Sequence, residues 1–113
     1  MKQFDAASFQ EEVLNNRFYS LVLFMTDWHE QSKSMIERLK LIQTKNDKVL
    51  VIGYIDVTLY PEVTKETNLK TLPHFILYGS NGKIMSEFTE LYSEWDLKVY
   101  MGDALYNMLI KPK

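Results

Sequence analysis

Strand-length apolar runs alternate with helical patterns along this chain of 113 residues. Residues 20–25 and 49–55 are the two strongest runs, and the second is apolar throughout, as central parallel strands are. The pair Asn81-Gly82 predicts a type I′ β-hairpin that joins residues 75–78 to 83–88, because both residues tolerate a positive φ. This order predicts an α/β fold, in which a mixed four- or five-stranded sheet is sandwiched between helices and closes on that hairpin.

Two helices are predicted in the first half of the chain. Ser8, followed three residues later by Glu11, is typical of a capping box and predicts a helix over residues 8–15. The central helix is predicted over residues 31–45, where the helical period gathers one apolar face from Met35, Ile36, Leu39 and Ile42.

Further elements are predicted at both ends of the chain. Residues 2–4 favour a short edge strand, and Pro61 suits the first turn of a short helix that ends near Asn68. Ser93 is expected to cap a single final helix, whose apolar face consists of Leu97, Met101, Ala104, Leu105 and Met108.

Composition restricts the classes of protein to which the chain can belong. Its length predicts a single domain over residues 1–113 with one core. A net charge of −2, with no long block of either sign, gives no footprint for nucleic acid or an anionic membrane surface. No apolar run reaches the length of a membrane span, and the polar residues 1–5 do not begin a signal peptide. We therefore expect a cytoplasmic protein.

The turn between the first strong strand and the central helix reads Trp-His-Glu-Gln-Ser-Lys over residues 28–33. A Trp at a strand-to-helix turn resembles the active site of the thioredoxin family, whose motif is Trp-Cys-Gly-Pro-Cys-Lys. In this alignment, His29 and Ser32 stand where the family has its two cysteines, and the chain contains no cysteine at all. Dithiol exchange needs one thiolate to attack and a second thiol to resolve the mixed disulfide, so that activity is excluded.

The resemblance extends over nearly the whole chain. Tyr54-Ile55-Asp56 is similar to the family's strand end, and Asn81-Gly82 falls at its hairpin. Thr71-Leu72-Pro73 is similar to the loop beside the active site whose proline is cis in that family, which implies a cis bond at Leu72–Pro73. The resemblance therefore implies the complete thioredoxin fold.

Four departures from the family pattern fall at positions that serve the redox cycle. Leu23 replaces a buried, proton-handling Asp, and Glu37 replaces a helix-kinking Pro. Glu90 replaces a Gly that leaves room for substrate backbone, and Glu30-Gln31 replaces Gly-Pro. These changes imply a redox-inactive member of the family rather than an engineered knockout.

The resemblance implies that an extended segment can pair with the backbone beside the cis-proline, which requires no cysteine. We therefore expect an adaptor, assembly or holdase-like module that binds a protein or an extended peptide through the former active-site face. Trp28 is the expected anchor unless it merely seals the end of the sheet, and Glu90 is expected to narrow the groove. The predicted partner-binding residues are Trp28, His29, Glu30, Gln31, Ser32, Leu72, Pro73 and Glu90.

Three other readings are open at this stage. His29 and Ser32 are one helical turn apart and resemble part of a nucleophilic site, but no orienting acid is evident. His29 and His74, with Glu30 or Glu90, are a weak metal-site pattern. The third reading is a structural subunit that self-associates as a homodimer through a sheet edge or a helix face. We expect no catalytic residue, metal or cofactor.

Overall fold

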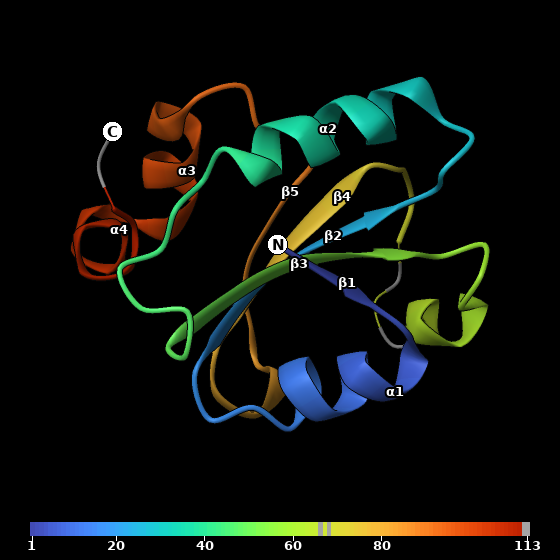
Figure 1. The fold of residues 1–113 in the computed structure, drawn as a ribbon, viewed down its shortest axis with the longest axis horizontal. Coiled ribbons are helices and arrows are strands. Elements are labelled where there is room, and N and C mark those ends of the chain that lie inside the picture. The colour runs from blue at the N-terminus through green and yellow to red at the C-terminus, as the bar shows by residue number, and fades with distance from the viewer. Residues whose placement is uncertain (66, 68, 112–113) are drawn as a thin grey trace.

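The computed structural model describes residues 1–65, 67 and 69–111, and over these residues a five-stranded mixed sheet forms the centre of the fold (Figure 1). The strands lie in the order β1 (Lys2–Phe4), β3 (Leu50–Asp56), β2 (Tyr19–Met25), β4 (His74–Tyr78) and β5 (Ile84–Phe88). β1, β3 and β2 are parallel, whereas β4 and β5 run antiparallel to their neighbours. The predicted mixed sheet, including its short edge strand, is confirmed.

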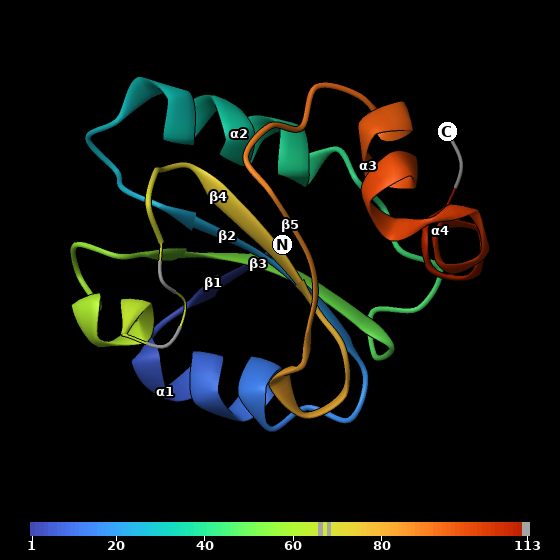
Figure 2. The ribbon, with the colours of Figure 1, turned by 180° about the vertical axis from the view of Figure 1, so that it is seen from behind.

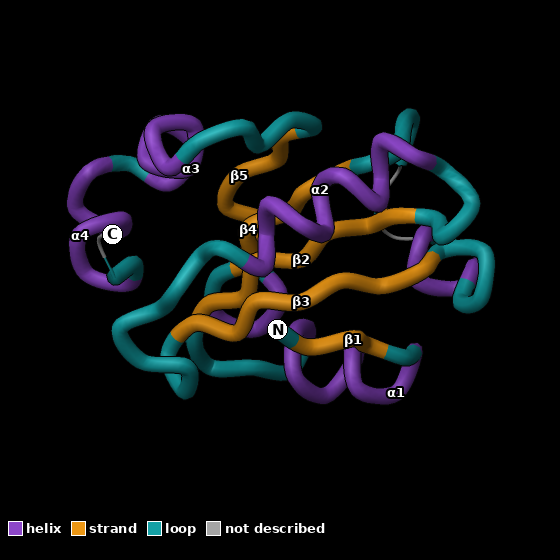
Figure 3. Tube along the Cα trace, turned by 45° about the horizontal axis from the view of Figure 1, so that its top comes forward, coloured by secondary structure: helices purple, strands orange, loops and turns teal. Residues whose placement is uncertain are grey.

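Helices cover both faces of this sheet (Figures 1 and 2). One face packs against α2 (Glu30–Lys40), α3 (Glu94–Met101) and α4 (Asp103–Leu109). The other face packs against α1 (Ala6–Phe9), which continues into a π-helical turn over Gln10–Leu14. Figure 3 shows the strands as one continuous layer between these helices.

β2 supplies side chains to two separate cores. Leu21, Leu23 and Met25 belong to the core beneath α2, whereas Val22 and Phe24 belong to the core above α1. Alternate residues of a strand point to opposite faces, so one apolar run serves both layers. All five side chains are buried.

The hairpin turn has the backbone that its sequence predicts. Asn81 has φ 57° and Gly82 has φ 74°, and the amide of Lys83 donates to the carbonyl of Ser80 at 3.2 Å. A positive φ at both central residues is the requirement of a type I′ turn.

The N-cap of the first helix lies three residues earlier than predicted. Asp5 is its N-cap, because the Ser8 amide donates to the Asp5 carboxylate at 2.7 Å and the Asp5 amide donates to the Ser8 hydroxyl at 2.9 Å. Ser8 therefore closes a capping box that Asp5 opens, and the prediction that Ser8 is the cap is wrong.

The central helix ends at Lys40 rather than at residue 45. The segment after it pairs with the end of α4, where the amide of Lys45 donates to the carbonyl of Leu109 and the amide of Lys111 donates to that of Gln43, both at 2.8 Å. These tertiary hydrogen bonds replace the predicted last helical turn. The short helix at Pro61 is a 3₁₀ turn over Pro61–Thr64, and the predicted end at Asn68 lies outside the described residues.

The predicted single final helix is two helices. Gly102, with φ 87° and ψ 150°, separates α3 from α4 and changes the direction of the chain. Consequently Tyr106 and Leu109 are buried, while the predicted core residue Met108 is exposed. The cap itself is confirmed, since Ser93 and Asp96 form a capping box.

No helix in the described ranges combines the length and the apolar character needed to cross a membrane.

Gly53 is required by the close approach of β1 to β3. A Cβ at this position would lie 2.4 Å from the carbonyl oxygen of Lys2 and 2.5 Å from Cε2 of Phe4. We predict that Gly53→Ala lowers the free energy of unfolding by about 1–3 kcal/mol, because β1 must move away from the sheet. Urea denaturation measures the change, with Ser34→Ala on the exposed side of α2 as the control. Equal stability of the two variants would contradict this account.

Candidate functional site

The turn from β2 to α2 carries the residues singled out by the sequence. His29 is the N-cap of α2, with φ −103° and ψ 116°, and the helix begins at Glu30. Nδ1 of His29 lies 3.2 Å from the hydroxyl oxygen of Ser32, one helical turn further on. The two side chains therefore face each other, as their spacing suggests.

Ser32 is completely buried, which limits what this pair can do. A serine nucleophile must reach an acyl carbon, and this hydroxyl lies on the inner side of α2, beneath the surface. Within the described part of the chain, no carboxylate hydrogen-bonds to His29, so the pair also has no orienting acid. The arrangement suits a structural hydrogen bond that fixes the first turn of α2.

Trp28 borders a surface groove. Its side chain is 74% exposed, so it does not seal the end of the sheet. The groove has a volume of about 450 Å³ and is lined by Thr26, Trp28, His29, Val57, Thr64, Leu69, Lys70, Thr71 and Leu72. The fold thus brings Trp28 and Leu72, 44 positions apart in the sequence, to one surface.

The loop at the far wall of this groove leads into β4. The peptide bond between Leu72 and Pro73 is cis, and Pro73 is buried and does not line the groove. In the described residues, the backbone groups of Thr71 and Leu72 make no hydrogen bond to other backbone groups. The wall therefore offers unpaired N–H and C=O groups beside an exposed indole.

The other predicted site residues lie outside this groove. Glu30 and Gln31 are exposed on the first turn of α2, where Glu30 lies 4.0 Å from the ammonium of Lys33. An acidic side chain is favourable at this end of a helix irrespective of function. Glu90 is exposed after β5 and does not line the groove, so it does not narrow it in this structure.

The two histidines do not meet. Nε2 of His74 lies 2.9 Å from a carboxylate oxygen of Glu87, on the neighbouring strand β5. His74 lines a different, shallow groove together with Thr67, Lys70, Thr71, Glu87 and Thr89. Among the residues that the structure describes, no group of three or more His, Asp or Glu side chains is arranged to hold a metal ion.

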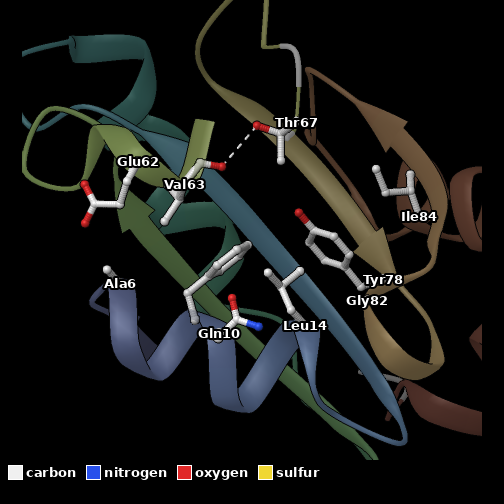
Figure 4. Close-up of a pocket in the computed structure, with 10 residues that line it drawn as sticks. Ala6, Gln10, Leu14, Glu62, Val63, Thr67, Tyr78, Gly82 and Ile84 are labelled. Atoms are coloured by element: carbon white, nitrogen blue, oxygen red, sulfur yellow. Dashed lines mark hydrogen bonds between the residues drawn. The ribbon is translucent and has the colours of Figure 1, made fainter. Parts of the chain in front are cut away.

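A second cavity lies on the α1 face of the sheet (Figure 4). It has a volume of about 190 Å³ and is bounded by α1 with its π-helical extension, the segment around the 3₁₀ turn Pro61–Thr64, and the β4–β5 hairpin. Figure 4 shows the Thr67 hydroxyl donating to the carbonyl of Val63, at 3.4 Å, on its rim. None of the predicted site residues lines it, so it is separate from the Trp28 groove.

Asp56 fixes the loops beside the groove, a role that was not predicted from the sequence. It ends β3 and is nearly buried, and its carboxylate accepts hydrogen bonds from the amide and hydroxyl of Thr58, at 2.9 and 2.5 Å, and from the amide of Asp27 at 3.3 Å. Burial favours the protonated form, but these hydrogen bonds outweigh it and hold the pKa of Asp56 below its ordinary value. An acidic residue directly after a buried apolar strand is the sequence signal for this role.

Comparisons with known proteins agree with this architecture. Residues 1–103 match the family model described as thioredoxin. The chain is 21% identical over 98 residues to the thioredoxin of Buchnera aphidicola subsp. Acyrthosiphon pisum (strain APS), an alignment that covers 87% of this chain and 90% of that protein. The crystal structure of human ERp44 is similar with a TM-score of 0.67 and 23% identity. That likeness covers 85% of this chain but only 30% of the ERp44 chain, and it concerns the fold alone.

We predict that Asp56→Asn lowers the free energy of unfolding at neutral pH by about 1.5–3 kcal/mol, because hydrogen bonds to a charged acceptor are lost. The folded-state pKa of Asp56 lies below the ordinary value of 3.8, so the stabilisation is complete above that value and is lost as the pH falls through the folded-state pKa. Urea denaturation at neutral and strongly acidic pH should show the difference from wild type shrinking in acid. The exposed Asp47→Asn is the control, and a pH-independent difference would refute the assignment.

Proposed function

Because this chain belongs to the thioredoxin family and contains no cysteine, we propose that it is a redox-inactive binding module that holds an extended protein segment in the Trp28 groove. The absence of thiols excludes dithiol exchange but leaves the shape of the site available. The observation that carries the proposal is that the exposed indole of Trp28 lines the same groove as Thr71 and Leu72, whose backbone groups make no hydrogen bond to other backbone groups in the described residues.

Trp28 supplies the apolar part of the proposed contact. The same groove is lined by Leu69, Leu72 and Val57. A side chain bound there is therefore removed from contact with water on several sides. Tryptophan is enriched among the residues that dominate binding energy at interfaces, particularly beside an apolar pocket. A partner segment with an apolar side chain facing Trp28 fits this lining.

The loop before β4 supplies the polar part. An extended segment that lies along Thr71 and Leu72 gains main-chain hydrogen bonds, the mode by which a peptide adds a strand to a sheet. Such hydrogen bonds depend little on the sequence of the partner, so the side-chain contacts determine the specificity of binding. Lys70 is exposed and lines both the Trp28 groove and the neighbouring groove that contains His74. Its positive charge favours an acidic residue in the bound segment.

The hydrogen bond between His29 and Ser32 supports the site from within. It fixes the first turn of α2 without presenting a reactive atom. Asp56 ties the loop between β2 and α2 to the end of β3, because its carboxylate accepts from the amide of Asp27. We propose that these contacts pre-organise the groove, which lowers the entropic cost of binding. We also propose a cytoplasmic location for the protein, as the sequence leads us to expect.

We predict that peptides selected from a random displayed library bind the isolated protein through this groove. Trp28→Ala is expected to weaken a selected peptide at least about thirtyfold, the effect of losing a central aromatic anchor. Leu72→Arg should weaken it similarly by obstructing the far wall. Titration of free peptide by fluorescence anisotropy measures both affinities.

Trp95→Ala is the matched control, since Trp95 is the second Trp of the chain and is also exposed, at 68%. In the variant Trp95→Phe, the emission of Trp28 should shift to shorter wavelength when peptide binds, because the indole leaves water. A selected peptide that binds wild type, Trp28→Ala and Leu72→Arg equally well would overturn the proposal. So would a library from which no peptide is enriched.

A further inference from the structure

The cavity on the α1 face of the sheet, which we call the α1 cavity, is large enough to hold a small molecule. Its volume is about 190 Å³. An engineered protein cavity of about 150 Å³, lined by apolar side chains, binds benzene. Phe9 and Tyr78 line the α1 cavity and are buried, whereas Ile84 at its edge is 42% exposed. The α1 cavity is therefore closed toward the core and open toward solvent.

A π-helical turn forms one wall of the α1 cavity. The amide of Asn15 donates to the carbonyl of Gln10 at 3.0 Å, five residues back, so this turn contains one residue more than an α-helical turn. Val13 of the turn is buried in the core, and the next residue, Leu14, lines the cavity. Single π-helical turns are rare, and they occur frequently at functional sites.

The β4–β5 hairpin forms a second wall, which is fixed to the first. The amide of Asn81 donates to the carbonyl of Asn16 at 2.6 Å. A Cβ at Gly82 would lie 3.1 Å from the Cα of Leu14, so the glycine lets the hairpin contact the end of the π-helical turn. These two walls are in place before anything binds, which lowers the entropic cost of holding a ligand between them.

The polar side chains that line the α1 cavity offer hydrogen-bond acceptors. Glu62 supplies a carboxylate, which forms no ion pair in the described part of the chain. The amide nitrogen of Gln10 donates to the side chain of Asn15 at 3.3 Å, so its carbonyl oxygen remains as an acceptor. The hydroxyl of Thr67 donates to the carbonyl of Val63, so its oxygen also remains as an acceptor.

We propose that the α1 cavity binds a small primary amine whose apolar body is an aromatic ring or a branched alkyl group. Figure 4 shows Leu14, Val63 and Tyr78 around a common space, with Glu62 at its edge. An ammonium group has three donors and no acceptor, so it matches a rim of acceptors. The described lining contains no Lys or Arg side chain, so the carboxylate of Glu62 favours a cation. The α1 cavity shares no lining residue with the Trp28 groove, so this site is additional to the one proposed for an extended segment.

Titration of the ¹⁵N-labelled chain with benzylamine, followed by amide chemical shifts, tests this proposal. We expect saturable shifts at Gln10, Leu14, Val63 and Gly82, with a dissociation constant of about 1 mM or lower, as for an efficient ligand of this size. Shifts that do not saturate would overturn the proposal. So would saturable shifts confined to the Trp28 groove.

Filling the α1 cavity tests where the ligand lies. Val63→Phe should weaken the binding of benzylamine at least about tenfold, because the added ring occupies the space that the ligand needs. Val99→Phe, at an exposed valine on α3, is the matched control and should leave the affinity unchanged. Ile84→Trp at the open edge should obstruct entry without altering the core, so it keeps the test decisive if Val63→Phe does not fold. Wild-type affinity in a folded variant of either kind would overturn the proposal.

Benzyl alcohol, a neutral molecule of nearly the same shape, tests the preference for an amine. It should bind about three- to fivefold more weakly than benzylamine, the effect of one exposed ion pair. Glu62→Gln should weaken benzylamine by the same factor and leave benzyl alcohol unchanged. Glu11→Gln, an exposed glutamate of the π-helical turn that does not line the cavity, is the control. Equal affinities of wild type for the two compounds would refute the proposed ligand class.

Discussion

Burial of β2 on both faces is the constraint on which the rest of this structure depends. Its alternate residues supply the core beneath α2 and the core above α1, so neither layer of helices can form without this strand. Full burial of each large apolar side chain stabilises the fold by about 1.5–3 kcal/mol, and β2 contributes five in succession. Leu23 is part of this arrangement and is fully buried in the core beneath α2.

The end of β2 also determines the chemistry of the site. The chain leaves the sheet, turns at Trp28 and enters α2, which places residues 29 and 32 one above the other. A histidine side chain and a buried serine hydroxyl occupy these two positions, and the chain contains no cysteine. The hydrogen bond between them preserves the local packing without a nucleophile within reach of solvent. The turn presents the indole of Trp28 to solvent.

Local chemistry made the strands, the Asn81-Gly82 turn and the Ser93 cap predictable, because each depends on residues that are neighbours in the sequence. The two helices that were predicted too long have different causes. α2 stops at Lys40 because the following residues bond to the end of α4. The last helix breaks at Gly102 because of the local backbone conformation of this glycine, although the apolar period continues past it. The burial of Ser32, the support from Asp56 and the position of Glu90 outside the groove likewise depend on elements far apart in the chain. The sequence by itself determined the fold and excluded dithiol chemistry. The spacing of the apolar residues and the lack of cysteine can both be read directly from the order of the residues. Only the tertiary structure decided which side chains face water, because exposure is set by what packs against them.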